Sequence, residues 1–96
     1  MKKFNEVKTL AERLLKSIDN RFCFSVEIDN EIPSYYKIKN NNYIDALRLA
    51  HNEYVNSIQS IETNESVIED MISLELTELD DEDSVIEVYY LDTFEL

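Results

Sequence analysis

The chain has 96 residues and a mass of 11.3 kDa, which suits one small domain spanning residues 1–96. It carries 21 acidic and nine basic residues, a net charge of −12, and its 44% apolar content is typical of a folded protein. It has no glycine, one cysteine and one histidine, which excludes glycine-rich phosphate loops, Cys/His zinc clusters and intramolecular disulfides.

The first predicted element is an amphipathic helix over residues 3–18, because apolar side chains from Phe4 to Ile18 recur at helical spacing. Asn20 is expected to end it, since asparagine tolerates the left-handed conformation better than most residues. Residues 21–28 alternate between apolar and polar side chains, which predicts a half-buried strand. A turn over 29–34, containing Pro33, leads to a return strand over 35–39 with Tyr36 and Ile38 inward.

A second helix is predicted over residues 42–59, capped from the asparagine run 40–42. Its inner stripe consists of Tyr43, Leu47, Ala50, Tyr54 and Ile58. The next segment, 64–78, fits either helical or strand spacing. We expect a short helical turn near 64–70 and a strand near 72–78, since a longer helix would place the acidic run at its carbonyl end.

The last predicted strand places Ile86, Val88, Tyr90 and Phe94 on its inner face, and Tyr89 and Leu91 on the other. The acidic run 80–83 then forms the tip of a second hairpin. The fold class that follows is α+β. Two main helices pack on a three- or four-stranded, mostly antiparallel sheet in two layers, in the order α-β-β-α-β-β. Because glycine is absent, the turns must depend on Asn and Asp.

Charge is distributed very unevenly along the chain. Residues 1–50 hold nine basic and seven acidic residues, a net of +2, whereas residues 51–96 hold fourteen acidic residues and no Lys or Arg. Such a surface repels nucleic acid and anionic membranes and attracts a cleft rich in Lys and Arg. We therefore expect no direct binding of nucleic acid or membrane, and a basic protein as partner. The alternative is that the excess acid only keeps the protein soluble.

The partner-binding residues predicted from this pattern lie on and around the second hairpin. They are Glu75, Glu78, Asp80, Asp81, Glu82, Asp83, Glu87 and Tyr89, with Glu62, Glu65, Glu69 and Asp70 as a second tier. Alternate residues of a strand lie about 6.6–6.8 Å apart, and two phosphate steps along one DNA strand advance about 6.8 Å. An acidic strand pair can therefore imitate the charge spacing of a nucleic acid.

No catalytic or cofactor chemistry is predicted. Cys23 lies in the middle of a strand and His51 on a helix surface, so nothing in the sequence pairs them as a nucleophile and its base. The acidic run could hold Ca²⁺ or Mg²⁺ only weakly, and a solvated turn is the simpler interpretation. No apolar run approaches the ~20 residues needed to span a bilayer, and a single cysteine fits a reducing compartment. We expect a cytoplasmic protein.

Small size, strong acidity, an α+β pattern and a Lys/Asn/Ile-rich N-terminal half resemble those of small phage-encoded inhibitors of bacterial defence, including anti-CRISPR proteins and anti-restriction DNA mimics. The resemblance is one of class, without a shared motif, so no residue roles are carried over. It implies a non-enzymatic inhibitor that occludes the nucleic-acid site of a nuclease or effector in the host cytoplasm. The alternative is another interaction module, such as an immunity protein, antitoxin or adaptor, that binds through Tyr35, Tyr89 and Leu91. An unpaired last strand would also permit a homodimer.

Overall fold

The computed structural model describes residues 1–28, 32–64 and 71–95. Two helices and four strands follow each other in the predicted order. They are α1 (Phe4–Leu15), β1 (Arg21–Ile28), β2 (Ser34–Lys37), α2 (Tyr43–Asn64), β3 (Met71–Leu79) and β4 (Val85–Glu95). The predicted helical turn lies outside the described residues, apart from Asn64, which ends α2. Neither helix, within the described residues, is long and apolar enough to cross a bilayer.

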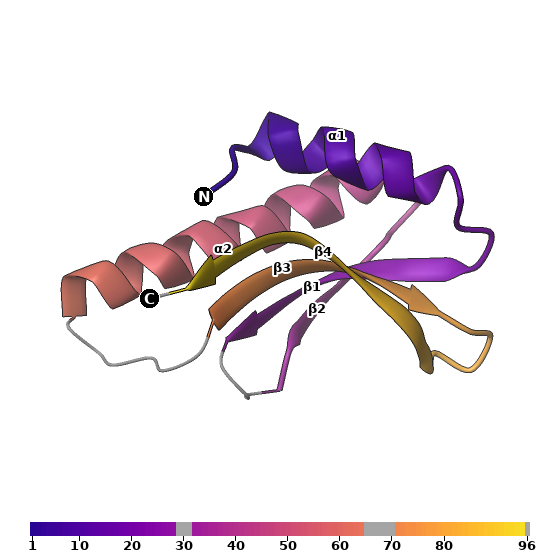
Figure 1. Ribbon diagram of the computed structural model, residues 1–96. Helices are drawn as coiled ribbons and strands as arrows, with labels where there is room; N and C mark the ends of the chain where they lie inside the picture. Colours follow the sequence, from indigo (N-terminus) through magenta and orange to yellow (C-terminus); the bar gives the residue numbers. More distant parts are fainter. Residues whose placement is uncertain (29–31, 65–70, 96) are drawn as a thin grey trace.

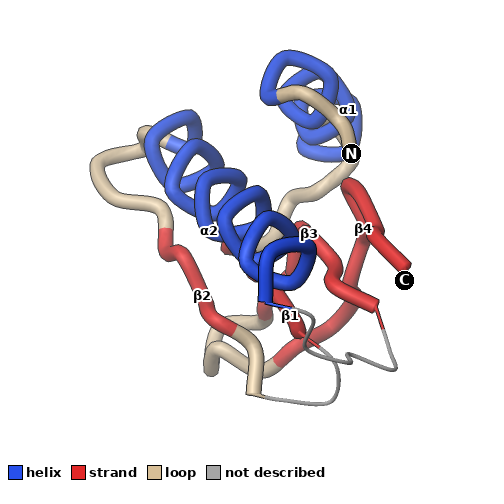
Figure 2. The backbone as a smooth tube through the Cα atoms, turned by 90° about the vertical axis from the view of Figure 1, so that its left-hand side faces the viewer, coloured by secondary structure: helices blue, strands red, loops and turns tan. Residues whose placement is uncertain are grey.

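The four strands form one antiparallel sheet in the order β2-β1-β3-β4, which confirms the predicted α+β class. Both helices lie on the same face of this sheet, with α2 across its middle and α1 above β4 (Figure 1, Figure 2). We call the opposite face of the sheet the helix-free face. β1 and β3 are the central strands, and β2 and β4 are the edges.

The hydrophobic core lies between the sheet and the helices, because apolar side chains of both layers point into that space. The predicted inner stripe of α2 is confirmed, with Leu47, Ala50, Tyr54 and Ile58 all fully or nearly fully buried. They pack with Val7 and Ala11 of α1 and with Phe24, Val26, Ile72, Leu74, Leu76 and Leu91 of the sheet.

The tight turns of this glycine-free chain use Asn and Asp, as predicted. Among the described residues, positive φ angles occur at Asn40 (53°), Asn41 (58°) and Asp83 (62°), and these residue types adopt that conformation most readily after glycine. Asn42 caps α2 by accepting the N–H of Asp45 on Oδ1 at 3.2 Å. Asn20 does not have a positive φ, and α1 ends earlier than predicted, at Leu15.

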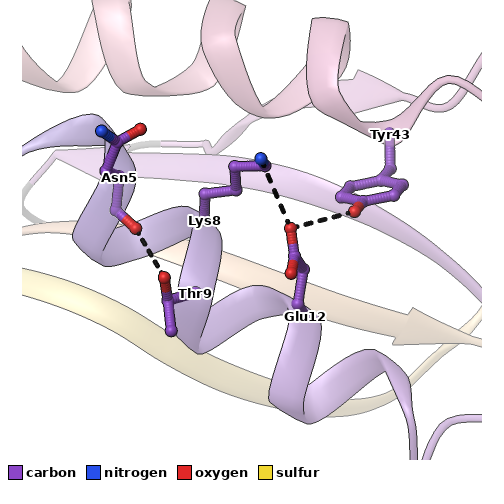
Figure 3. Close-up of polar contacts among 5 residues, drawn as sticks. All are labelled: Asn5, Lys8, Thr9, Glu12 and Tyr43. Carbon is purple, nitrogen blue, oxygen red and sulfur yellow. Dashed lines mark hydrogen bonds and ion pairs between the residues drawn. The ribbon is translucent and has the colours of Figure 1, made fainter.

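A polar contact joins the two helices. The hydroxyl of Tyr43 on α2 donates to Glu12 of α1 at 3.2 Å, and Lys8 lies 3.7 Å from the same carboxylate oxygen (Figure 3). One turn earlier, the hydroxyl of Thr9 donates to the carbonyl of Asn5 (Figure 3). Tyr43 therefore ties the start of α2 to the middle of α1.

The side-chain assignment on β4 was right for Phe94, which packs against the core, but wrong for Tyr89, Tyr90 and Leu91. Tyr89 and Leu91 contribute to the core, whereas Tyr90 is 54% exposed on the helix-free face. The cause is a break in register, since Leu74 pairs with Asp92 but Glu75 pairs with Tyr90. A β-bulge inserts one extra residue here and reverses the alternation beyond it.

The prediction that β1 is only half-buried was also wrong. Cys23, Phe24, Ser25 and Val26 are all buried, so both faces of this strand are shielded. The reason is its central position, because side chains of β2 and β3 lie beside those of β1 on both faces of the sheet. Alternation of apolar and polar residues predicts which side chains share a face, but not how well each face is covered.

Candidate functional site

The acidic run forms the turn between β3 and β4, as predicted, and its first residue organises it. The N–H of Asp80 donates to the carbonyl of Ser84 at 2.9 Å. The Oδ1 atom of Asp80 accepts the N–H groups of Glu82 and Ser84, both at 2.9 Å. Asp80 therefore shapes the turn, because an aspartate carboxylate in a turn commonly accepts hydrogen bonds from the backbone N–H groups of the residues that follow it.

Asp83 also has a local partner. Its Oδ1 atom lies 2.8 Å from Nη1 of Arg21 at the start of β1, so this ion pair ties the turn to the neighbouring strand. Both side chains are about half exposed, and exposed pairs of this kind contribute only about 0.2–1 kcal/mol to stability. Part of the charge of the acidic run is thus neutralised within the protein.

Three other carboxylates of this region are exposed. We call Asp81, Glu82 and Glu87 the tip carboxylates; within the described part of the chain, no hydrogen bond or ion pair involves their side chains. Val85 and Ile86 lie between them in the chain and are 52% and 50% exposed. The turn itself lies at the opposite end of the molecule from the C-terminus (Figure 1). This arrangement offers negative charge beside apolar surface to an approaching partner.

The remaining predicted residues do not join the tip. Glu78 is buried, and its carboxylate accepts the hydroxyl of Tyr89 at 3.1 Å and the amide of Asn20 at 2.6 Å. Glu75 is only 4% exposed. Both carboxylates belong to a central strand and serve contacts within the protein. In the second tier, Glu62 lies in α2, and Glu65, Glu69 and Asp70 lie outside the described residues.

A buried polar cluster, which the sequence does not predict, surrounds Glu75 in the middle of the helix-free face. Its oxygen atoms accept the hydroxyls of Ser25, at 3.1 Å, and Ser73, at 2.9 Å. The hydroxyl of Ser25 also lies 3.0 Å from that of Thr77. These residues are adjacent because of the register of β1 and β3, which the sequence does not reveal. Their hydroxyls satisfy a carboxyl group that would otherwise be costly to bury.

Burial raises the pKa of Glu75 above its ordinary value, and the nearby carboxylate of Glu27 raises it further, against the lowering effect of the two serine hydroxyls. A raised carboxyl pKa in the folded state favours the protonated form. The stabilisation that protonated Glu75 gives the folded state is complete at pH values below the unfolded-state pKa. It is lost as the pH rises through the folded-state pKa. At pH values above the unfolded-state pKa, the burial of Glu75 therefore lowers the stability of the fold.

We expect Glu75→Gln to increase the free energy of unfolding at pH 7, because glutamine resembles the protonated acid. The increase should disappear at a pH below the ordinary carboxyl pKa, where the native side chain is protonated in both states. Urea unfolding at both pH values measures this, with the exposed Glu95→Gln as matched control. A less stable Glu75→Gln protein at pH 7 would contradict the account.

Cys23 and His51 lie in different parts of the fold. Cys23 is buried on the helix-free side of β1, and burial raises the pKa of its thiol. His51 lies on α2, where Nε2 is 3.0 Å from the carbonyl of Lys2 and the ring meets Phe4 edge-on. The fold thus keeps the two side chains apart. Within the ranges that the structure describes, no group of three or more His, Cys, Asp or Glu residues is arranged to hold a metal ion.

The tyrosine surface of the alternative hypothesis is also rearranged. Tyr89 and Leu91 lie in or against the core, so they are not available as surface anchors. Tyr35 is exposed, as predicted, and so is Tyr90; the two lie at opposite ends of one row across the helix-free face. Ser25 and Glu75 lie between them, because Tyr35 pairs with Ser25, Ser25 with Glu75, and Glu75 with Tyr90.

Comparisons of the chain with protein-family models, curated proteins and solved structures find no match. Any functional assignment therefore depends on the charge and geometry of the chain itself.

Proposed function

We propose that this protein is a non-enzymatic inhibitor that binds a basic nucleic-acid-binding protein, such as a nuclease or effector, by imitating the charge of nucleic acid. The observation that carries this proposal is the exposure of the tip carboxylates, Asp81, Glu82 and Glu87, at one end of the molecule. A chain without Lys or Arg after Arg48 has few means of neutralising them internally. A Lys- or Arg-rich cleft would supply the missing positive charge.

The structure also supports a division of roles within the acidic run. Asp80 and Asp83 are used to build and anchor the turn, so the proposal assigns binding to the tip carboxylates instead. Val85 and Ile86 add exposed apolar surface at the same place. Apolar residues within a ring of charged groups are the usual composition of a protein interface. Contact with a cleft would shield both kinds of group from solvent.

Capture from lysates tests this function. Tagged protein is incubated with nuclease-treated lysates of bacteria that carry nuclease-based defence systems, at low and high salt, and bound proteins are identified by mass spectrometry. We expect a nucleic-acid-binding protein that is captured at low salt and released at high salt, because screening weakens exposed ion pairs. Capture that survives high salt, or capture of proteins unrelated to nucleic acids, would contradict the proposal.

A further inference from the structure

Among the described strands, β4 has the longest unpaired edge. β4 extends over 11 residues and pairs only with β3 among the described strands, whereas the opposite edge strand, β2, has four residues. An unpaired edge presents backbone N–H and C=O groups that can pair with a strand from another chain. Natural proteins usually shorten, cover or charge such edges.

The N-terminal segment covers one part of this edge. The ammonium group of Lys2 donates to the carbonyl of Leu91 at 3.0 Å, and the N–H of Lys2 donates to the carboxylate of Asp92 at 2.9 Å. These contacts occupy β4 near its middle. The part from Val85 to Tyr90, which continues directly from the acidic turn, is not covered in this way.

The free part of β4 has two chemically different faces. Val85, Val88 and Tyr90 pair with Leu79, Thr77 and Glu75, so their side chains share the helix-free face. Val85 and Tyr90 are each more than half exposed. Glu87 pairs with Glu78 on the other face, and its carboxylate is exposed. A strand added here would meet apolar side chains on one face and negative charge on the other.

We propose that β4 binds an extended segment of the partner protein as a fifth strand, at Val85–Tyr90. Opposite Glu87–Tyr90, where β4 pairs regularly with β3, the segment would alternate apolar residues, facing Val88 and Tyr90, with Lys or Arg, facing Glu87 beside the acidic turn. Backbone hydrogen bonds would give affinity and the alternating side chains would give specificity. This inference rests on the proposed function and specifies how the partner is held. A second copy fits less well, because both edges would carry Glu87 and both chains a net charge of −12.

The test uses the full-length protein and a short synthetic peptide in which valine and lysine alternate. A second peptide has the same sequence with every backbone amide N-methylated, so it keeps the charge but cannot donate backbone hydrogen bonds. Binding of both is measured by isothermal titration calorimetry at low salt. We expect the methylated peptide to bind at least about tenfold more weakly, because pairing at an edge depends on backbone donors.

Two variants of β4 locate the binding. Glu87→Gln should weaken binding of the unmethylated peptide several-fold. Glu95→Gln, which changes another exposed residue of β4 beyond the contacts of Lys2, should leave that binding unchanged. Circular dichroism of both variants checks that the fold is retained. Protection of β4 amides from hydrogen exchange on peptide binding would support the same position.

Equal binding of the two peptides would overturn strand addition but leave the proposed charge mimicry intact. Failure of both peptides to bind, while a basic nucleic-acid-binding protein is still captured, would also overturn it. Concentration-dependent self-association through β4 in analytical ultracentrifugation would assign the edge to a second copy and contradict the inference. The capture experiment alone decides the proposed function, so the two failures can be distinguished.

Discussion

Neutralising the three tip carboxylates will weaken binding to the captured partner without damaging the fold. The variant combines Asp81→Asn, Glu82→Gln and Glu87→Gln. Each lost ion pair is expected to cost about 0.5 kcal/mol of binding free energy, and three together about 1.5 kcal/mol, which is about a tenfold loss of affinity. Surface plasmon resonance at low salt measures this loss, and the salt dependence of binding should become shallower.

A matched control separates the position of the charges from their number. The variant with Glu6→Gln, Asp45→Asn and Glu95→Gln removes the same number of exposed acidic charges from α1, α2 and the end of β4. We expect it to retain nearly the affinity of the natural protein. Equal weakening by both variants would show that net charge, and not the hairpin tip, controls binding.

Of the substitutions proposed for this protein, Phe24→Ala will lower the free energy of unfolding the most. The side chain is fully buried at the centre of β1 and meets Phe22 edge-on with ring centroids 6.0 Å apart. Truncation of a buried phenylalanine costs about 3–5 kcal/mol through lost burial and the cavity that remains. For a small domain of about 5–15 kcal/mol total stability, this is a large fraction.

Urea unfolding followed by circular dichroism measures this cost. Leu49→Ala is the control, since Leu49 is an exposed apolar residue of α2, and surface changes are usually within about 0.5 kcal/mol. Similar losses from the two substitutions would mean that the core is not located where the fold places it.

Local patterns predicted most of the secondary structure, because each element depends on neighbouring residues. The alternation in 21–28 matches β1 residue for residue, and Asn42 caps α2 as expected. The ambiguous segment 72–78 is a strand, β3. Its partners are β1 and β4, and long-range pairing of this kind overrides weak local preference.

The sequence predicts only those parts of the candidate site that depend on the positions of charged residues and of the turn. The location of the acidic run at a hairpin tip follows from the flanking strand patterns. The burial of Glu75 and Glu78 does not, because it depends on β3 being central in the sheet, and strand order is not visible in local periodicity. The exchange of roles between Tyr89 and Tyr90 depends on a bulge opposite Leu74 and Glu75, for which the sequence gives no glycine or other signal.

Competition with DNA tests the central claim most directly. The partner identified by capture is purified and bound to a fluorescently labelled DNA duplex, and the protein is titrated in while anisotropy is recorded. If the hairpin tip occupies the nucleic-acid site, the natural protein will displace the duplex, and the tip variant will need about ten times more protein to do so. A stable complex of partner, DNA and this protein together, with no displacement, would contradict the account.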